Sequence, residues 1–331
     1  MTSINQYNYT LDYLKGLACF CVVFMHCEFP GIVGIVVQAL GRFAVPLFFM
    51  VSGYFSFYPD KGKVNGGGYN YSIIQKKLNH IFTIVFWSSL FYFGYAFVLR
   101  GTYSVTRNDV WAFGVLNQPF IIVGQLWFLF ALLYDYIAFG FIWKINKINI
   151  FYCVSIILFV VYICLAQGAH LCGITIPNMY YRNWLIEGLP FFFAGHWIHA
   201  NQYKISLSGK MLFLVILVST SLCLVERKIM GRDFGVNIMT FPQVFALFIY
   251  AVKYPDRHRG VIQEIGKRYS MWVYILHPFV FLSMDRIYHH WTVDTVVLVQ
   301  WFRPIVTVVI TLILSSICYA VLHRDKMKMA S

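Results

Sequence analysis

Residues 11–26 read LDYLKGLACFCVVFMH, and this stretch determines how the rest of the chain is interpreted. It is apolar except for a few positions, and it begins a largely apolar run that continues to about residue 37. Apolar runs of about 20 residues are long enough to cross a bilayer as a helix. We therefore predict that a membrane-spanning helix begins near residue 11.

The whole chain has the composition of a membrane protein. Of its 331 residues, 60% are hydrophobic and only 12% are charged, whereas soluble domains are about 25% charged. This composition excludes a soluble globular protein. The aromatic share of 19% suits a chain whose rings lie at membrane interfaces. We predict an all-α polytopic membrane protein that forms a single transmembrane domain over residues 1–331, with no separate soluble domain.

Hydropathy predicts about ten transmembrane helices. Their approximate limits are 11–37, 38–58, 79–99, 121–143, 148–166, 184–200, 211–225, 237–252, 267–288 and 298–322. With the N-terminus in the cytoplasm, 16 of the 26 Lys and Arg residues fall in inner loops and only 6 in outer loops. Cytoplasmic loops are enriched in these residues. Both termini are therefore predicted to be cytoplasmic, in a multi-pass protein of the inner (cytoplasmic) cell membrane.

The remaining composition excludes several other classes of function. The formal net charge is +13, but the basic residues are distributed over short loops between apolar runs, which argues against nucleic acid as a partner. Most of the 8 Cys lie inside apolar runs, and their spacing matches neither a disulfide framework nor a zinc site. We predict no metal and no permanently bound cofactor.

Polar residues of the first predicted span share one helix face. At about 100° per residue, Asp12, Lys15, Cys19 and His26 fall within a sector of roughly 60°, whereas Glu28 points to the opposite side. Lys15 and His26 are separated by about 16 Å along the helix axis. Ionisable groups are costly in hydrocarbon and therefore mark candidate functional sites. The alternative is that Lys15 is an interfacial anchor and His26 a hydrogen-bonding core residue.

Several segments together resemble the acyltransferase-3 family, the membrane-bound O-acyltransferases of bacterial envelopes. Lys15, ten further residues and His26 match the spacing in the family's first helix. Residues 41–54, GRFAVPLFFMVSGY, resemble its second helix. Shorter matches to later helices are LWFL at 126–129, LPFFFAG at 189–195 and YILHP at 274–278. The resemblance covers nearly the whole chain.

The resemblance implies that acetyl-CoA or another acyl-CoA is the co-substrate and that it binds from the cytoplasm. Family members often carry Arg-x-x-Arg at the start of the third helix, where this chain has KKLNH at residues 76–80. Positive charge is kept, but the bidentate geometry of arginine is not. We expect the phosphates of the donor to be bound by Lys15, which Asp12 orients, together with Lys76, Lys77 and His80.

The same resemblance suggests roles in the chemistry. His26 is expected to be the general base, because histidine exchanges protons near neutral pH; a covalent acyl carrier is the alternative. We expect the acceptor to be contacted by Arg42, Gln125, Trp127, Glu187 and His277. Four of these have a structural alternative: an interfacial anchor for Arg42, an aromatic belt for Trp127, a solvated helix end for Glu187, and packing or a helix kink for His277.

The predicted function is transfer of an acetyl or other short acyl group from acyl-CoA to a hydroxyl of an envelope carbohydrate or a lipid-linked glycan precursor. A membrane transporter or flippase for a polar or glycan-related substrate is the alternative, since intramembrane charges also line transport paths. The expected partners are acyl-CoA, the glycan acceptor and the lipid bilayer. The sequence leaves open whether the chain forms a homo-oligomer.

Overall fold

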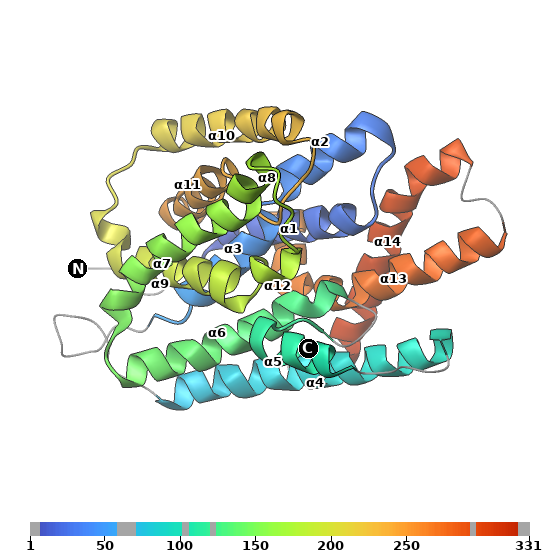
Figure 1. Cartoon of the computed structure of the whole chain (residues 1–331), viewed down its shortest axis with the longest axis horizontal. Coiled ribbons are helices and arrows are strands. Elements are labelled where there is room, and N and C mark those ends of the chain that lie inside the picture. The colour runs from blue at the N-terminus through green and yellow to red at the C-terminus, as the bar shows by residue number, and fades with distance from the viewer. Residues whose placement is uncertain (1–6, 58–70, 101–105, 120–123, 292–295, 324–331) are drawn as a thin grey trace. The chain divides into compact units, whose positions relative to one another are not determined.

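The computed structural model describes residues 7–57, 71–100, 106–119, 124–291 and 296–323, and within these ranges all regular structure is helical. Each of the ten predicted runs contains a helix (Figure 1). Six helices of the described part are long and apolar enough to cross a membrane: Gly31–Tyr54, Ile73–Val98, Gly124–Lys144, Ile148–Leu171, Gly209–Met230 and Val297–Leu322. The chain is therefore a multi-pass membrane protein.

The chain divides into two compact units. Unit 1 comprises residues 1–47 and 207–331. Its helices are α1 (Tyr9–His26), α2 (Gly31–Gly41), the start of α3 (Ala44–Tyr54), α10 (Gly209–Met230), α11 (Thr240–Lys253), α12 (Val261–Arg268), α13 (Ser270–His290) and α14 (Val297–Leu322).

Unit 2 comprises residues 48–206 and contains the remainder of α3. Its other helices are α4 (Tyr71–Arg100), α5 (Arg107–Leu116), α6 (Trp127–Lys144), α7 (Ile148–Ile163), α8 (Ala169–Leu171) and α9 (Leu189–Asn201). Short 3₁₀ turns lie at Gly124–Leu126, Asn178–Tyr180 and Gln202–Lys204, and π-helical turns lie at Cys164–Gly168 and Trp184–Gly188. The sequence did not predict α5, which is a short helix without buried residues.

The boundary between the first two predicted spans is wrong by about ten residues. We expected it near residue 37, but α1 ends at His26 and the next apolar helix begins at Gly31. Pro30 precedes that helix, and the residue before a proline is disfavoured from helical geometry. Gly31 then adopts a φ of +63°, which glycine tolerates without steric cost. The helix is therefore interrupted between His26 and Gly31.

Unit 1 is organised around a close contact between α1 and α12. A Cβ atom on Gly16 would lie 2.1 Å from the carbonyl oxygen of Ile262, and one on Gly266 would lie 1.8 Å from that of Asp12. Only glycine permits this approach of the two backbones. The start of α1 is also fixed, because the Thr10 N–H donates to the Pro255 carbonyl at 2.9 Å.

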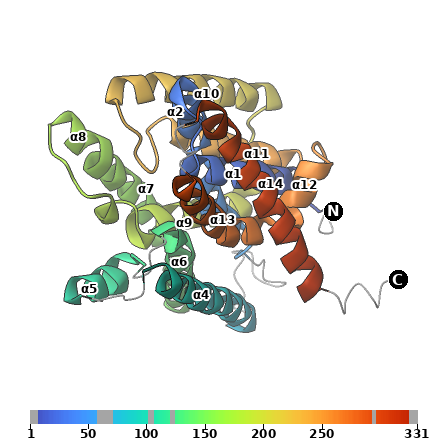
Figure 2. The same cartoon turned by 90° about the vertical axis from the view of Figure 1, so that its right-hand side faces the viewer.

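Unit 2 has an equivalent contact between α3 and α9. A Cβ atom on Gly53 would lie 1.8 Å from the carbonyl oxygen of Phe192, and one on Gly195 would lie 1.9 Å from that of Met50. Aromatic rings pack α9 against α7, with the centroids of the half-buried Phe159 and the buried Phe191 4.8 Å apart. In the same unit α4 runs beside α6 (Figures 1 and 2).

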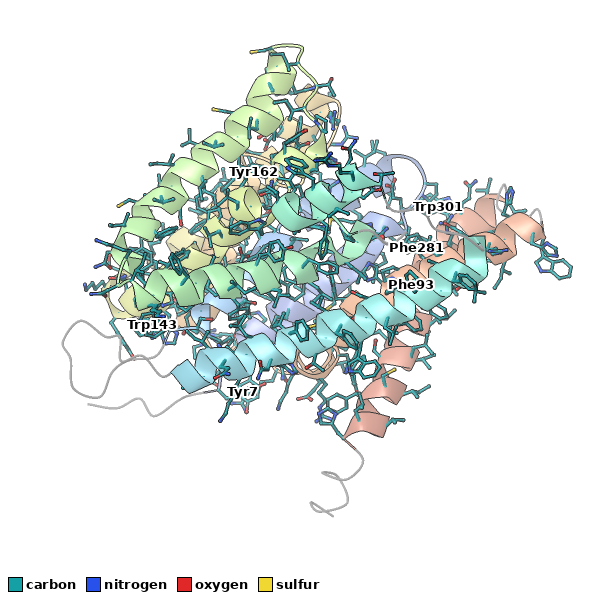
Figure 3. All side chains as sticks on the ribbon, turned by 60° about the horizontal axis from the view of Figure 1, so that its bottom comes forward. Tyr7, Phe93, Trp143, Tyr162, Phe281 and Trp301 are labelled. Atoms are coloured by element: carbon teal, nitrogen blue, oxygen red, sulfur yellow. The ribbon has the colours of Figure 1, made fainter. Side chains whose placement is uncertain are left out.

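The outward faces of several helices are apolar, as expected for surfaces that contact lipid. On α4, for example, Phe93 is 56% exposed, whereas Tyr162 inside the same unit is 1% exposed (Figure 3). The exposed apolar residues of α4 are Phe82, Phe86, Trp87, Leu90, Phe91, Phe93, Phe97 and Val98. This distribution agrees with the membrane location predicted from composition.

We expect Gly53→Ala to destabilise the protein by about 1–3 kcal/mol, because the added methyl group collides with backbone that has no room to move. Gly94→Ala on α4 is the matched control, since a Cβ atom there meets nothing within 4 Å. Thermal unfolding in detergent measures both. Equal melting temperatures for the two variants would contradict the proposed close contact.

Candidate active site

The polar stripe of α1 comprises Asp12, Lys15, Cys19 and His26. Its charged end is a cluster of paired side chains in unit 1. Lys15 Nζ donates to Asp12 Oδ1 at 2.8 Å, which confirms the predicted pairing of these residues. Asp12 also accepts a hydrogen bond from the Tyr7 hydroxyl. Burial and this hydrogen bond raise the pKa of Tyr7 above its ordinary value. Both donors hold the Asp12 carboxylate, and Asp12 in turn orients the Lys15 ammonium group.

At the other end of the stripe, His26 lies against a second histidine. The rings of His26 and His277 stack with centroids 5.4 Å apart and an interplanar angle of 25°. Phe281 lies 6.4 Å from His26, nearly parallel to it. His26 is half-buried, whereas His277 is fully buried. The sequence assigned these histidines to separate roles, and the structure brings them together.

A backbone carbonyl group of α13 determines which tautomer His277 adopts. Its Nδ1 lies 3.1 Å from the Val273 carbonyl oxygen, which can only accept, so Nδ1 carries the proton. Nε2 is buried and has no hydrogen-bond partner among the described residues. The neutral ring therefore presents a lone pair at Nε2 inside unit 1. Cys19, also on the stripe, is buried and lies 3.9 Å from the Ser270 carbonyl.

Arg42 belongs to a charge cluster that the sequence did not reveal. Its Nη2 lies 3.5 Å from Asp233 Oδ2, and Arg227 Nε lies 3.0 Å from the same oxygen. Glu226 fixes the loop that carries Asp233, since its carboxylate accepts the backbone N–H groups of Ile238 and Met239 at 2.7 and 2.9 Å. Arg42 is thus held by protein contacts in unit 1 and is more than a solvated interfacial anchor.

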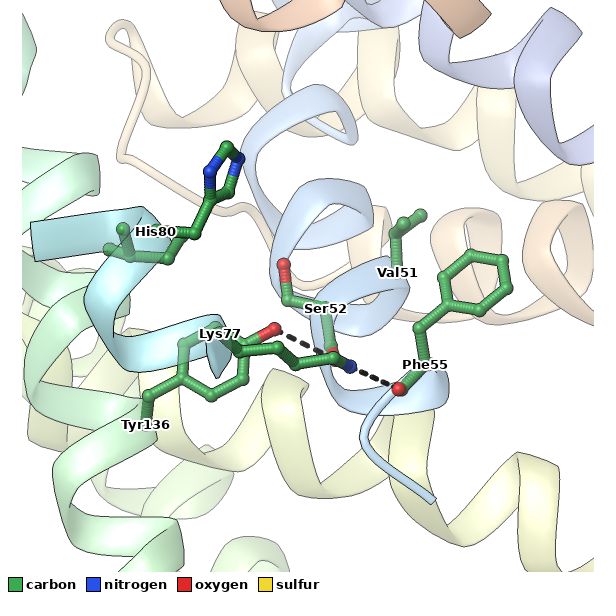
Figure 4. A pocket seen from close by; sticks show the side chains of 7 residues that line it. Val51, Ser52, Phe55, Lys77, His80 and Tyr136 are labelled. Carbon is green, nitrogen blue, oxygen red and sulfur yellow. Dashed lines mark hydrogen bonds between the residues drawn. The ribbon is translucent and has the colours of Figure 1, made fainter. Parts of the chain in front are cut away.

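Unit 2 contains a pocket of about 250 Å³ beside the end of α3 (Figure 4). Lys77 donates to the Phe55 carbonyl, and the Tyr136 hydroxyl donates to the Ser52 carbonyl at 3.4 Å. Both bonds satisfy carbonyl groups at the C-terminal end of α3, where a positive charge is favourable. The residues that line the pocket are Val51, Ser52, Phe55, Lys77, His80, Ile81 and Tyr136.

The two lysines of the KKLNH segment differ in position. Lys77 and His80 line the pocket, whereas Lys76 is exposed and does not line it. Lys15 belongs to unit 1. Binding of the donor phosphates by Lys15 together with the unit 2 residues Lys76, Lys77 and His80 therefore stays a prediction. Within unit 2, Lys77 is the cation whose ammonium group reaches the pocket (Figure 4).

The remaining predicted acceptor residues lie in unit 2. Trp127 begins α6 and is buried, and Gln125 is half-buried in the preceding 3₁₀ turn. Glu187 lies in the π-helical turn and is only 1% exposed, so it is a buried carboxyl and not a solvated helix end. Two residues that the sequence did not single out, Asn117 and Arg182, contact Trp127.

The described side chains form no group of three or more His, Cys, Asp or Glu that could hold a metal ion. Unit 1 offers a half-buried imidazole at His26 and cations at Lys15 and Arg42, and unit 2 offers a cation at Lys77. These are the groups that acyl transfer between a thioester and a hydroxyl requires.

Comparison with known proteins assigns the family. The family model described as an acyltransferase domain, of the acyltransferase-3 family, matches residues 8–320 and thus nearly the whole chain. No curated protein and no solved structure matches the chain. The match extends over both units and includes Asp12, Lys15, His26, Arg42, Lys77 and His277. The chain therefore belongs to the acyltransferase-3 family and is a membrane acyltransferase.

Proposed function

We propose that this protein transfers an acetyl or other short acyl group from acyl-CoA to a hydroxyl of an envelope carbohydrate or lipid-linked glycan precursor, with His26 as the general base. The observation that carries this proposal is the stacked His26–His277 pair at the end of α1 opposite to Lys15. It combines a half-buried imidazole that a substrate can reach with a second, fully buried imidazole behind it.

The reaction follows from the chemistry of these groups. The neutral His26 ring accepts the proton of the acceptor hydroxyl while the oxygen attacks the thioester carbonyl. The carbon–sulfur bond then breaks, and the coenzyme A thiolate leaves and takes up the proton that His26 has gained. No proton or electron is left over, so no further reactant is needed. General-base catalysis of this kind contributes about 10²–10⁴-fold to the rate.

For the donor, we propose that Lys15 binds the phosphate end of acyl-CoA, about 16 Å from His26 along α1. The pantetheine arm of coenzyme A is long and thin enough to extend over that distance. In unit 2, the pocket beside Lys77 and His80 supplies cationic and aromatic side chains suited to part of the donor. Ligand pockets usually exceed about 300 Å³, so this one would enclose only part of coenzyme A.

We expect His26→Ala to lower acyl transfer by at least about 100-fold while the protein still folds and inserts, because the ring is only half-buried. The measurement is thiol release from acetyl-CoA by the purified protein, with and without envelope glycan, alongside thermal unfolding. Cys19→Ala is the matched control, since it lies on the same stripe and should retain activity. Turnover near wild type in well-folded His26→Ala would reject this mechanism.

The donor site predicts a difference between neighbouring lysines. Lys77→Ala should raise the KM for acyl-CoA, and more so at low salt where the lost coulombic attraction is strongest. Lys76→Ala, which removes an exposed charge outside the pocket, should have a smaller effect. Lys77→Arg should preserve most of the affinity. Unchanged donor affinity in the Lys76→Ala/Lys77→Ala double variant would exclude this segment from the donor site.

A further inference from the structure

Arg182 and Trp127 form a cationic shelf in unit 2. The guanidinium carbon of Arg182 lies 4.7 Å from the centroid of the Trp127 ring. The Trp127 side chain is almost completely buried. The guanidinium therefore lies over the indole ring. Stacking of this kind is a property of arginine that lysine does not share.

Arg182 has no acidic partner among the described residues, and its Nε is buried without a hydrogen-bond partner there. Several other arginines of the described part are paired with carboxylates, as in Arg227 with Asp233 and Arg303 with Asp285. A partly buried cation without a counter-charge carries a desolvation cost. A bound anion would offset that cost.

The shelf is held in place by one asparagine. Asn117 is fully buried and has a φ of +49°. Its Nδ2 donates to the Trp127 carbonyl at 3.0 Å, and its Oδ1 accepts the Trp184 N–H at 2.7 Å. The backbone N–H of Arg182 donates to the backbone carbonyl of Asn178 at 2.7 Å. The start of α6 and the segment that carries Arg182 are thus tied to the same side chain.

Apolar segments of the chain adjoin the shelf. Trp127 lies near the start of the apolar span Gly124–Lys144. The indole N–H of Trp184 donates to the Val115 carbonyl at 2.9 Å, which attaches α5 to this region. Exposed apolar side chains nearby in the chain are Val110, Trp111 and Val115 of α5, and Leu185. A ligand here would be an amphiphile in the membrane.

We propose that the Arg182–Trp127 shelf binds the phosphate group of a membrane-embedded amphiphile. Arginine N–H groups bind phosphate oxygens in a bidentate manner, and these bonds are stronger than those between neutral groups. The phosphate can come from the headgroup of an anionic phospholipid or from a lipid-linked glycan acceptor. The first source is independent of the proposed function, and the second rests on it and would assign the acceptor to phosphate-linked lipids.

The test measures binding in nanodiscs without any acyl donor, so its result does not depend on catalysis. The probes are phosphatidylglycerol and a polyprenyl phosphate, each titrated into a phosphatidylcholine bilayer and detected by native mass spectrometry. We expect Arg182→Gln to weaken binding of at least one probe by about tenfold, and Arg182→Lys to retain an intermediate affinity. Arg232→Gln is the control, because Arg232 also stacks on a ring, that of Phe234 in unit 1.

The outcomes separate the two sources. Loss of phosphatidylglycerol binding alone in Arg182→Gln supports the headgroup as the source, and selective loss of the polyprenyl phosphate supports the acceptor. Trp127→Leu should weaken the same probe, whereas Trp127→Phe should largely retain it. Equal binding by wild type and Arg182→Gln, or no binding of either probe by wild type, would overturn the proposal. A His26→Ala protein that is inactive but binds the probes as well as wild type would support the independence of this binding site from catalysis.

Discussion

Burial of apolar side chains gives helices in a bilayer little reason to associate, because lipid tails are as apolar as the side chains themselves. In this protein, close backbone contacts at glycine join helices in both units. Gly16 and Gly266 bring α1 and α12 together in unit 1, and Gly53 and Gly195 do the same for α3 and α9 in unit 2. Gly16 directly follows Lys15, and Gly53 directly follows Ser52 of the pocket. Lys15 and Ser52 are therefore each the chain neighbour of a close-packed glycine.

The sequence predicted the helical class, the apolar runs and the Asp12–Lys15 pair, because each of these follows from local composition or from helix periodicity. It placed the first boundary wrongly, since the run from 11 to 37 remains apolar through the turn. The backbone effects of Pro30 and Gly31, rather than hydropathy, define where α1 ends. Pro30 is thus the sequence signal that marks this turn.

Contacts between side chains far apart in the chain could not be predicted from the sequence, for a different reason. Nothing in local spacing indicates that His26 stacks on His277, or that Arg42 and Arg227 share Asp233. Asn117 carries no chemical signal in the sequence, although it links α6 to the turn before α9. Helix periodicity predicts which side chains share one face of a helix, but not which other helix packs against that face. The partners of intramembrane polar groups therefore had to come from the tertiary structure.

The π-helical turn at Trp184–Gly188 gives the segment before α9 a fixed register. Such a turn accommodates one more residue than an α-helical turn, as shown by the bond from the Leu189 N–H to the Trp184 carbonyl. Each residue rotates an α-helix by about 100°. Deleting one residue here would restore regular helix but turn every preceding side chain by that angle relative to α9. The buried position of Glu187 and the direction of Arg182 are thus encoded as much by the length of this segment as by its residue types.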